Sequence, residues 1–381
     1  MKTRMTTFGE LAPADFDRWR ELADNAIEPN AFLDPRFLAP GDRATDDVKS
    51  NPVLLVEETG TLHALMPFDV LGRSIRGLRV RAVTPGISFL KHLTPRYFPL
   101  VSTARTVEAL EALLHGMSRL HLPDYVDFEG FVGEGPLADS LASASAAAGA
   151  PLVERGSLDY AFVRRTDEVV PAGNAIAAAP ARIAVDHLGS SSRKKFRQYF
   201  RGMEQAGDSP ILFTDRGDDP HAVEEFLDLQ AAGWKGDPAK GGGAFRINGY
   251  DRWFVEAAAA FRGDGRLSVF TLTSDDKTVY MQVAIRSGNG MFAAQDAYDE
   301  QLAKFRPGNL GRLAVIAHSM TDTRASFFDP NMHPQYVDST QLYPHRRRYV
   351  SYLLTHHGAI AKAVVGSIPL LRRARDRIKP Q

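Results

Sequence analysis

The sequence contains no cysteine among its 381 residues. Disulfide bonds, thiol nucleophiles and cysteine-ligated zinc are therefore excluded, and the absence agrees with a reducing, cytoplasmic compartment. Metal-ligand spacing is also missing from the remaining residue types. The pair His356-His357, for example, has no partner at ligand spacing, so we expect no metal.

The chain also lacks an excess of charge of either sign and a long apolar run. The chain has 46 basic and 46 acidic residues and a formal net charge of +0, which argues against a nucleic-acid partner. No apolar run approaches the roughly 20 residues that a membrane-spanning helix needs. Residues 1–11 carry charges without an apolar core, so they do not form a secretory signal. We expect a soluble protein, at most peripheral to a membrane.

What is present is an ordinary globular composition, 44% apolar and 24% charged, spread over a length that favours two domains. Each half contains strand-like runs followed by a helix and a further strand. This pattern predicts an α+β fold with two lobes, each a mixed, mostly antiparallel sheet flanked by helices. The expected boundaries are an N-terminal lobe at 1–165, an Ala- and Pro-rich linker at 166–189, a C-terminal lobe at 190–345 and a basic tail at 346–381.

The stretch 267–325 organises the second half. Three β-branched and apolar runs, at 267–273, 279–285 and 291–295, are separated by polar turns and predict an antiparallel meander. A glycine-containing loop at 305–311 follows and opens a helix. Free backbone N–H groups and the helix dipole meet at such a helix start, where they favour an anion such as a pyrophosphate.

Four short stretches in this half occur in a characteristic order: Ser-Arg-Lys-Lys-Phe-Arg-Gln-Tyr-Phe-Arg at 192–201, then 226–234, the aspartates within 295–299, and Arg-Pro-Gly-Asn-Leu at 306–310. With the meander, loop, helix and strand they resemble the GNAT acyltransferase fold. More specifically, they resemble the tandem-GNAT family of cellulose-biosynthesis (CelD-type) acyltransferases, which is related to the Fem peptidyltransferases. The resemblance covers roughly residues 190–329, and the first half only by architecture.

This resemblance implies an enzyme, a GNAT-family N- or O-acyltransferase. It implies acetyl-CoA or a longer acyl-CoA as donor, and as acceptor an amine or hydroxyl of a sugar or cell-envelope precursor, as in polysaccharide biosynthesis. At the loop, the candidate donor-binding residues are Arg306, Gly308, Asn309, Leu310, Gly311 and Arg312. The alternative interpretation of the loop is an ordinary Pro-Gly turn capped by Asn309.

Acyl transfer from a thioester needs a base for the attacking group and a proton donor for the leaving thiolate. Asp296 and Asp299, at the end of a central strand, are candidates for the base or for orienting the acceptor. Tyr298 between them is the candidate proton donor. The alternative is that these residues only cap the turn into 300–304.

Candidate substrate-binding residues lie on two further segments. Arg193, Lys194 and Arg197 could hold a phosphate or an acidic sugar, although such a basic run is often a solvated helix face. Trp234 and Lys235 follow a helix and precede a glycine loop, where an indole could stack on a sugar ring or simply close the edge of the core.

The sequence departs from the pattern of that family at two positions, and other functions therefore stay open. Asn309 stands where the usual acetyl-CoA loop has its first glycine, and Val337 follows Tyr336 where family members have lysine. The alternatives are a Fem-type transferase that uses aminoacyl-tRNA, which the neutral charge disfavours, and a non-catalytic scaffold that binds carbohydrate or a protein partner on the same fold.

The tail is basic and partly apolar. It can lie on an anionic membrane surface or pack on the domain with its charges in water. Pro369 is expected to interrupt any single helix there.

Overall fold

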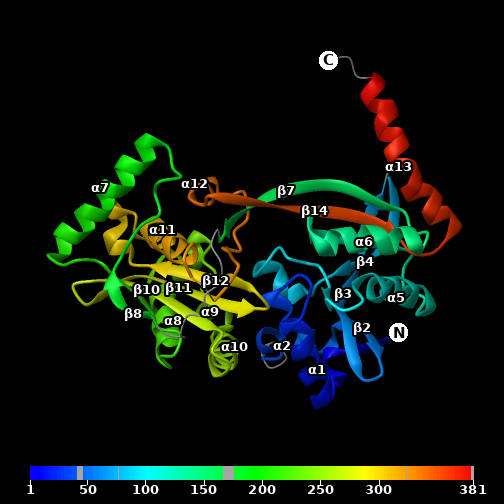
Figure 1. Ribbon diagram of the computed structural model, residues 1–381, viewed down its shortest axis with the longest axis horizontal. Helices are drawn as coiled ribbons and strands as arrows, with labels where there is room; N and C mark the ends of the chain where they lie inside the picture. The colour runs from blue at the N-terminus through cyan, green and yellow to red at the C-terminus, as the bar shows by residue number, and fades with distance from the viewer. Residues whose placement is uncertain (41–45, 76, 166–175, 323, 379–381) are drawn as a thin grey trace. The chain divides into compact units, whose positions relative to one another are not determined.

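The computed structural model describes residues 1–40, 46–75, 77–165, 176–322 and 324–378. The chain forms two compact units (Figure 1). Unit 1 comprises Met1–Pro35, Thr45–Asp159 and Arg347–Gln381, and unit 2 comprises Arg36–Ala44 and Tyr160–Arg346. Strands β7 (Leu152–Arg164) and β14 (His345–Thr355) contribute residues to both units.

The sheet of unit 1 has the strand order β1-β2-β3-β4-β6-β14-β7, with β5 beside β3. Among its pairings with a defined register, all are antiparallel except that of β4 with β6. The edge strand β1 (Lys2–Thr7) was not predicted, because its mostly polar sequence has no strand-like apolar alternation. The remaining strands are β2 (Pro52–Glu58), β3 (Thr61–Ile75), β4 (Leu78–Pro85), β5 (Leu100–Val101) and β6 (Tyr125–Val132). The helices include α1 (Pro13–Asp24), α4 (Asp46–Ser50), α5 (Thr106–Arg119), α6 (Pro136–Ala147) and α13 (Ala359–Ile378).

The C-terminal segment differs from the expected basic tail. Its first residues belong to β14, where Arg347 donates from Nη2 to Glu28 Oε2 at 2.6 Å. The prediction that Pro369 interrupts the helix was wrong, because α13 runs through it. The ring removes one backbone donor and crowds the preceding turn. Burial of Val365 against Ile75 and Leu353 on the adjoining strands offsets that cost, and α13 bends along its length (Figure 1).

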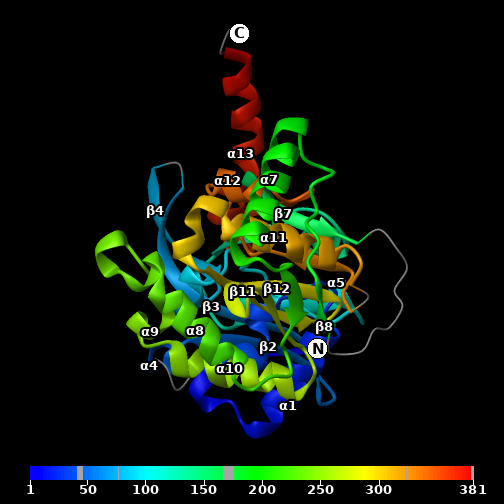
Figure 2. The ribbon, with the colours of Figure 1, turned by 90° about the vertical axis from the view of Figure 1, so that its left-hand side faces the viewer.

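The sheet of unit 2 has the order β7-β13-β12-β11-β10-β9-β8, with only β12 and β13 parallel among the pairings with a defined register. Helices α7 and α11 cover one face, and α8 and α10 cover the other (Figures 1 and 2). The predicted α+β class with a mostly antiparallel sheet is confirmed. The strands are β8 (Ile176–Pro180), β9 (Leu212–Asp215), β10 (Leu267–Ser274), β11 (Lys277–Ser287), β12 (Gly290–Tyr298) and β13 (Phe327–Asp329). The helices include α7 (Ser190–Gly207), α8 (Ala222–Ala232), α9 (Phe245–Asn248), α10 (Asp251–Gly263), α11 (Pro307–Ser319) and α12 (Val337–Thr340).

The expected linker at 166–189 is only partly described. Residues 166–175 lie outside the described residues, and 176–180 form β8, which pairs with β9. The Ala-rich composition that suggested a linker is thus compatible with an edge strand.

The predicted meander is confirmed as β10, β11 and β12, and a bulge sets which side chains face α11. Val283 pairs with Gln295 while Ala284 pairs with Ala293, so Ala294 is an extra residue in β12. Before the bulge, Ala293 faces the α11 side and belongs to its core. Strand alternation would place residue 295 there next. The bulge moves Asp296 there instead, opposite Gln282.

Strand β12 is also only partly paired on its other edge. The three-residue strand β13 pairs with Gly290, Met291 and Phe292 alone. The rest of β12, from residue 293 to 298, therefore has no strand partner on that edge within the described part of the chain. This edge lies next to the start of α11.

Candidate functional site

Three side chains from different elements of unit 2 meet around Asp296. Arg312, in α11, donates from Nε and Nη2 to Asp296 Oδ2, each at 2.8 Å. Lys235 Nζ lies 3.4 Å from Asp296 Oδ1 and donates to the Asp296 carbonyl oxygen at 2.6 Å. The sequence analysis placed these residues in three separate roles, and the structure brings them together in one cluster.

Local structure fixes both cations. Lys235 lies in the short 3-10 turn Trp234–Gly236 after α8, and its carbonyl accepts from Ala244 N at 2.8 Å. Gly236 permits this turn, since a Cβ there would lie 1.8 Å from the Ala231 carbonyl oxygen. Arg312 is held by a further bond, from its Nη1 to Ser339 Oγ at 2.9 Å.

The cluster is sheltered but not sealed. The side chains of Asp296, Arg312 and Lys235 retain 13%, 14% and 21% of their exposure. Two cations share one carboxylate, so the cluster carries an uncompensated positive charge when Lys235 is protonated. Such an excess is costly away from water unless an anion or a change of protonation relieves it.

Protonation equilibria reflect this arrangement. Burial alone would raise the pKa of the Asp296 carboxyl, but Arg312 and Lys235 outweigh burial and hold that pKa below its usual value. For Lys235, burial is the largest cause and lowers the pKa of the amino group; the Asp296 charge opposes this, and Arg312 adds to it. Asp296 is thus held ionised while Lys235 is pushed toward its neutral form.

Two buried polar groups of β11 point to unfilled binding capacity beside Asp296. Gln282 Oε1 has no hydrogen-bond partner within the described residues, and the Tyr280 hydroxyl interacts with the Asp296 carboxylate without a hydrogen bond of regular geometry. Burial raises the pKa of Tyr280, and the Asp296 charge raises it further. Sequence reasoning missed both residues. Their signal was a tyrosine and a glutamine two positions apart in an otherwise apolar strand.

The start of α11 differs from the open amide cradle that the sequence suggested. The N–H groups of Asn309 and Leu310 both donate to the Arg306 carbonyl, at 3.0 and 3.1 Å. A Cβ on Gly308 would lie 2.8 Å from the Tyr298 ring, and one on Gly311 would lie 2.2 Å from the Tyr280 ring. Both glycines therefore serve close helix–sheet packing, and the exposed Arg306 side chain remains as a candidate anion ligand.

The other predicted site residues lie apart from the cluster or have local partners. Asp299 caps the following turn by accepting from Gln301 N at 2.8 Å. The Trp234 indole is 40% exposed. On α7, Arg193 donates to the Asp186 and Leu188 carbonyls, Arg197 pairs with the Asp186 carboxylate, and Lys194 is exposed.

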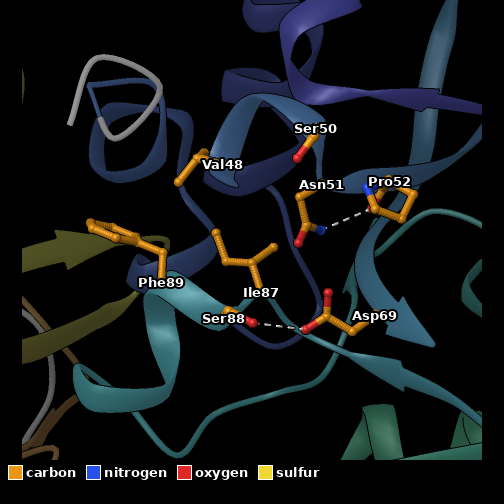
Figure 3. A pocket seen from close by; sticks show the side chains of 8 residues that line it. All are labelled: Val48, Ser50, Asn51, Pro52, Asp69, Ile87, Ser88 and Phe89. Carbon is orange, nitrogen blue, oxygen red and sulfur yellow. Dashed lines mark hydrogen bonds between the residues drawn. The ribbon is translucent and has the colours of Figure 1, made fainter. Parts of the chain in front are cut away.

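A cavity of about 350 Å³ lies within unit 1 (Figure 3). Its polar groups already have partners. Ser88 Oγ donates to Asp69 Oδ2 at 3.3 Å, and Asn51 Nδ2 donates to backbone carbonyls at Pro52 and Phe68. Since none of the described residues that line it carries a cationic side chain, this cavity provides no constellation comparable to the one at Asp296.

Within the described ranges, no group of three or more His, Asp or Glu side chains could hold a metal ion. Across the same ranges, every helix is too short or too polar to cross a bilayer.

Residues 190–329 match the family model of the acetyltransferase (GNAT) domain. The second half of the chain thus contains a GNAT domain. A solved structure from Bacteroides thetaiotaomicron, described as a conserved protein of unknown function, superposes with a TM-score of 0.52 at 12% identity, covering 91% of this chain and 98% of that one. That likeness shows the fold alone. No curated protein matches the sequence.

Two further solved structures have lower scores. A tandem GNAT protein from the clavulanic acid biosynthesis pathway gives a TM-score of 0.40 at 11% identity, covering 94% of this chain and 100% of that one. L-PGS from Bacillus licheniformis gives 0.42 at 10% identity, covering 94% and 96%. The narrower CelD-type relation stays a prediction.

Proposed function

We propose that the protein is an intracellular acyltransferase that moves an acyl group from acyl-CoA to an amine or hydroxyl of a sugar or cell-envelope precursor. The observation that carries this proposal is the Lys235–Asp296–Arg312 cluster, which lies inside the segment matching the acetyltransferase domain. Charged groups cluster there beside the unpaired edge of β12 and the start of α11.

The donor is assigned to the start of α11. Arg306 supplies an exposed guanidinium for the phosphates of acyl-CoA, with the dipole of a helix beginning at Pro307 behind it. Asn309 and the Gly308 amide are secondary contacts. The acyl thioester then extends along the free edge of β12, where backbone groups of residues 293–298 can bind it.

The acceptor is assigned to the side of the cluster near Trp234. An exposed indole next to Lys235 gives a sugar ring an apolar surface to stack on, beside polar groups that can orient its amine or hydroxyl. Tyr298 is the assigned proton donor for the leaving thiolate, and Asp299 and the basic residues Arg193, Lys194 and Arg197 take at most a peripheral role.

Calorimetric titration of acetyl-CoA and palmitoyl-CoA into the purified protein tests the donor assignment. We expect saturable binding that Arg306→Ala weakens about tenfold, equivalent to about 1.4 kcal/mol. Arg252→Ala is the matched control, because Arg252 is 80% exposed and pairs only within its own helix turn, with Glu256.

The same titration separates the alternatives. Binding of charged tRNA without binding of either acyl-CoA would favour a Fem-type transferase. Binding of neither would favour the non-catalytic scaffold.

The membrane contact of the C-terminal segment is a separate part of the proposal. Ile360 and Leu370 of α13 are 82% and 64% exposed, and the same helix carries Lys362 and four arginines. Exposed apolar groups among cations suit an anionic lipid surface. Unchanged co-sedimentation with phosphatidylglycerol vesicles after deletion of α13 would contradict this contact.

A further inference from the structure

Lys235 differs from an ordinary surface lysine in its contacts. Its Nζ donates to the Asp296 carbonyl at 2.6 Å, while its other contacts, to Gln295 Oε1 and Asp296 Oδ1, are long at 3.3 and 3.4 Å. A neutral amine has two N–H groups and a lone pair, so loss of a proton would leave the short bond intact and give up only one long contact.

The groups around Lys235 come from several elements. Asp296 of β12 favours the ammonium form, whereas Arg312 of α11 disfavours it, as does burial, which has the largest effect on its pKa. Tyr280 of β11 and the buried Tyr343 also face Asp296 and Arg312, and both phenols have a raised pKa from burial first and the Asp296 charge after it. Both therefore stay neutral and do not compensate the excess positive charge.

We infer that Lys235 is the general base that accepts a proton from an attacking amine, and that Asp296 is a positioning residue that holds Lys235 and Arg312 in place. This inference rests on the proposed acyl transfer and concerns its amine acceptors. Asp296 is a poor base because two cations stabilise its ionised form. Lys235 is also the most exposed member of the cluster, so an acceptor can reach it more readily than Asp296 or Arg312.

The step balances without another reagent. An N–H bond of the acceptor breaks toward the lone pair of Nζ as the acceptor nitrogen bonds the thioester carbonyl carbon. The C–S bond then breaks and the CoA thiolate takes a proton from the Tyr298 hydroxyl. Lys235 releases its proton to solvent, and the Tyr298 phenolate recovers one from solvent.

A labelling experiment tests the base independently of turnover. The full-length protein is trace-labelled with acetic anhydride across pH 6 to 11, and the modification of each lysine is measured by mass spectrometry. Lys240 is the matched reference, because it lies in the same loop with its side chain 64% exposed. We expect the labelling of Lys235 to rise at a lower pH than that of Lys240. Coincident midpoints would overturn the inference, whether or not the protein transfers acyl groups.

Kinetics supply the second test. Acetyl-CoA or palmitoyl-CoA is supplied with glucosamine or lysine as the amine acceptor, and release of free CoA thiol is followed across the pH range. Lys235→Arg keeps the charge but cannot act as a base near neutral pH, so we expect kcat/KM to fall about 10²- to 10⁴-fold. In the Lys235→Arg variant the decrease in rate at low pH should also disappear. Lys240→Arg is the control and should have the rate and the pH profile of the protein without substitutions.

The outcomes distinguish the two proposals. An unmodified protein that releases CoA, together with a Lys235→Arg variant that keeps both rate and pH profile, would overturn the base and leave acyl transfer standing. Absence of acyl-CoA binding would overturn acyl transfer and, with it, the catalytic role of Lys235.

Discussion

Two charge clusters in unit 2 are built from similar side chains but differ in how fully their carboxylates are paired and in their exposure to solvent. In the Asp215–Asp322–Arg324 cluster, Arg324 donates from Nη1 to Asp215 Oδ2 at 2.8 Å and from Nε to Asp322 Oδ1 at 3.0 Å. Asp215 Oδ1 also accepts from the backbone N–H groups of Gly217 and Val269. Asp322 Oδ2 accepts from Arg324 Nη2 at 3.0 Å, so every carboxylate oxygen of this cluster has a hydrogen-bond donor.

The two clusters also differ in their exposure to solvent. The side chains of Asp215, Asp322 and Arg324 retain only 0%, 4% and 4% of their exposure. The cluster around Asp296 is more open and has more cations than carboxylates. Full pairing and closure are typical of a cluster that fixes strands and loops in place, whereas an excess of cations with partial access is typical of a site awaiting a ligand.

The strongest way to test the comparison is to unbalance the closed cluster. Arg324→Met should leave two carboxylates buried without their main counter-ion and lower the free energy of unfolding by about 3–5 kcal/mol. Urea denaturation followed by circular dichroism measures it. Arg252→Met, which removes an exposed ion pair, should change stability by less than about 0.5 kcal/mol. Equal effects for the two variants would contradict the distinction.

The open cluster should respond in activity more than in stability. Asp296→Asn keeps the side-chain shape but removes the charge that holds Lys235 and Arg312, so we expect kcat/KM to fall about 10²-fold. The low-pH limb should also move to lower pH, because Asp296 favours the ammonium form of Lys235. Steady-state rates across pH measure both effects, and an unchanged profile would separate Asp296 from the site.

The packing of α11 on the sheet positions Arg312 in the cluster around Asp296. Gly311→Ala would place a Cβ 2.2 Å from the Tyr280 ring, and the helix must shift away from β11 to relieve the clash. We expect a loss of about 1–3 kcal/mol in the free energy of unfolding, with a lower rate because Arg312 shifts as well. Gly263→Ala is the control, since no atom lies within 4 Å of its added Cβ.

The smallest effect concerns acid stability. Burial alone would raise the pKa of Asp322, but His318 and Arg324 outweigh burial and hold that pKa well below its usual value. Its contribution to stability is therefore present above the ordinary carboxyl pKa of about 3.9 and is lost as pH falls through the lower folded-state value. Asp322→Asn should flatten the acid limb of a stability–pH curve measured between pH 2 and 7. An unchanged slope would show that Asp322 does not contribute to the loss of stability in acid.

Much of unit 2 follows from sequence pattern. The meander and the helix after it were predictable, because turn residues and apolar periodicity are local signals. The roles of Asp296, Arg312 and Lys235 stay predictions. Edge strand β1 and the continuous helix through Pro369 were not, since pairing with a distant strand and burial of Val365 stabilise them.

The sequence by itself determined the meander and the helix that follows it, the absence of cysteine thiols and the residue types available for acyl transfer. Only the tertiary structure decided which of them meet. One bulged residue, Ala294, turns Asp296 toward α11, and a glycine-permitted turn brings Lys235 to the same carboxylate. Register and long-range contact are set by the packing of whole elements, which no local pattern in the chain records.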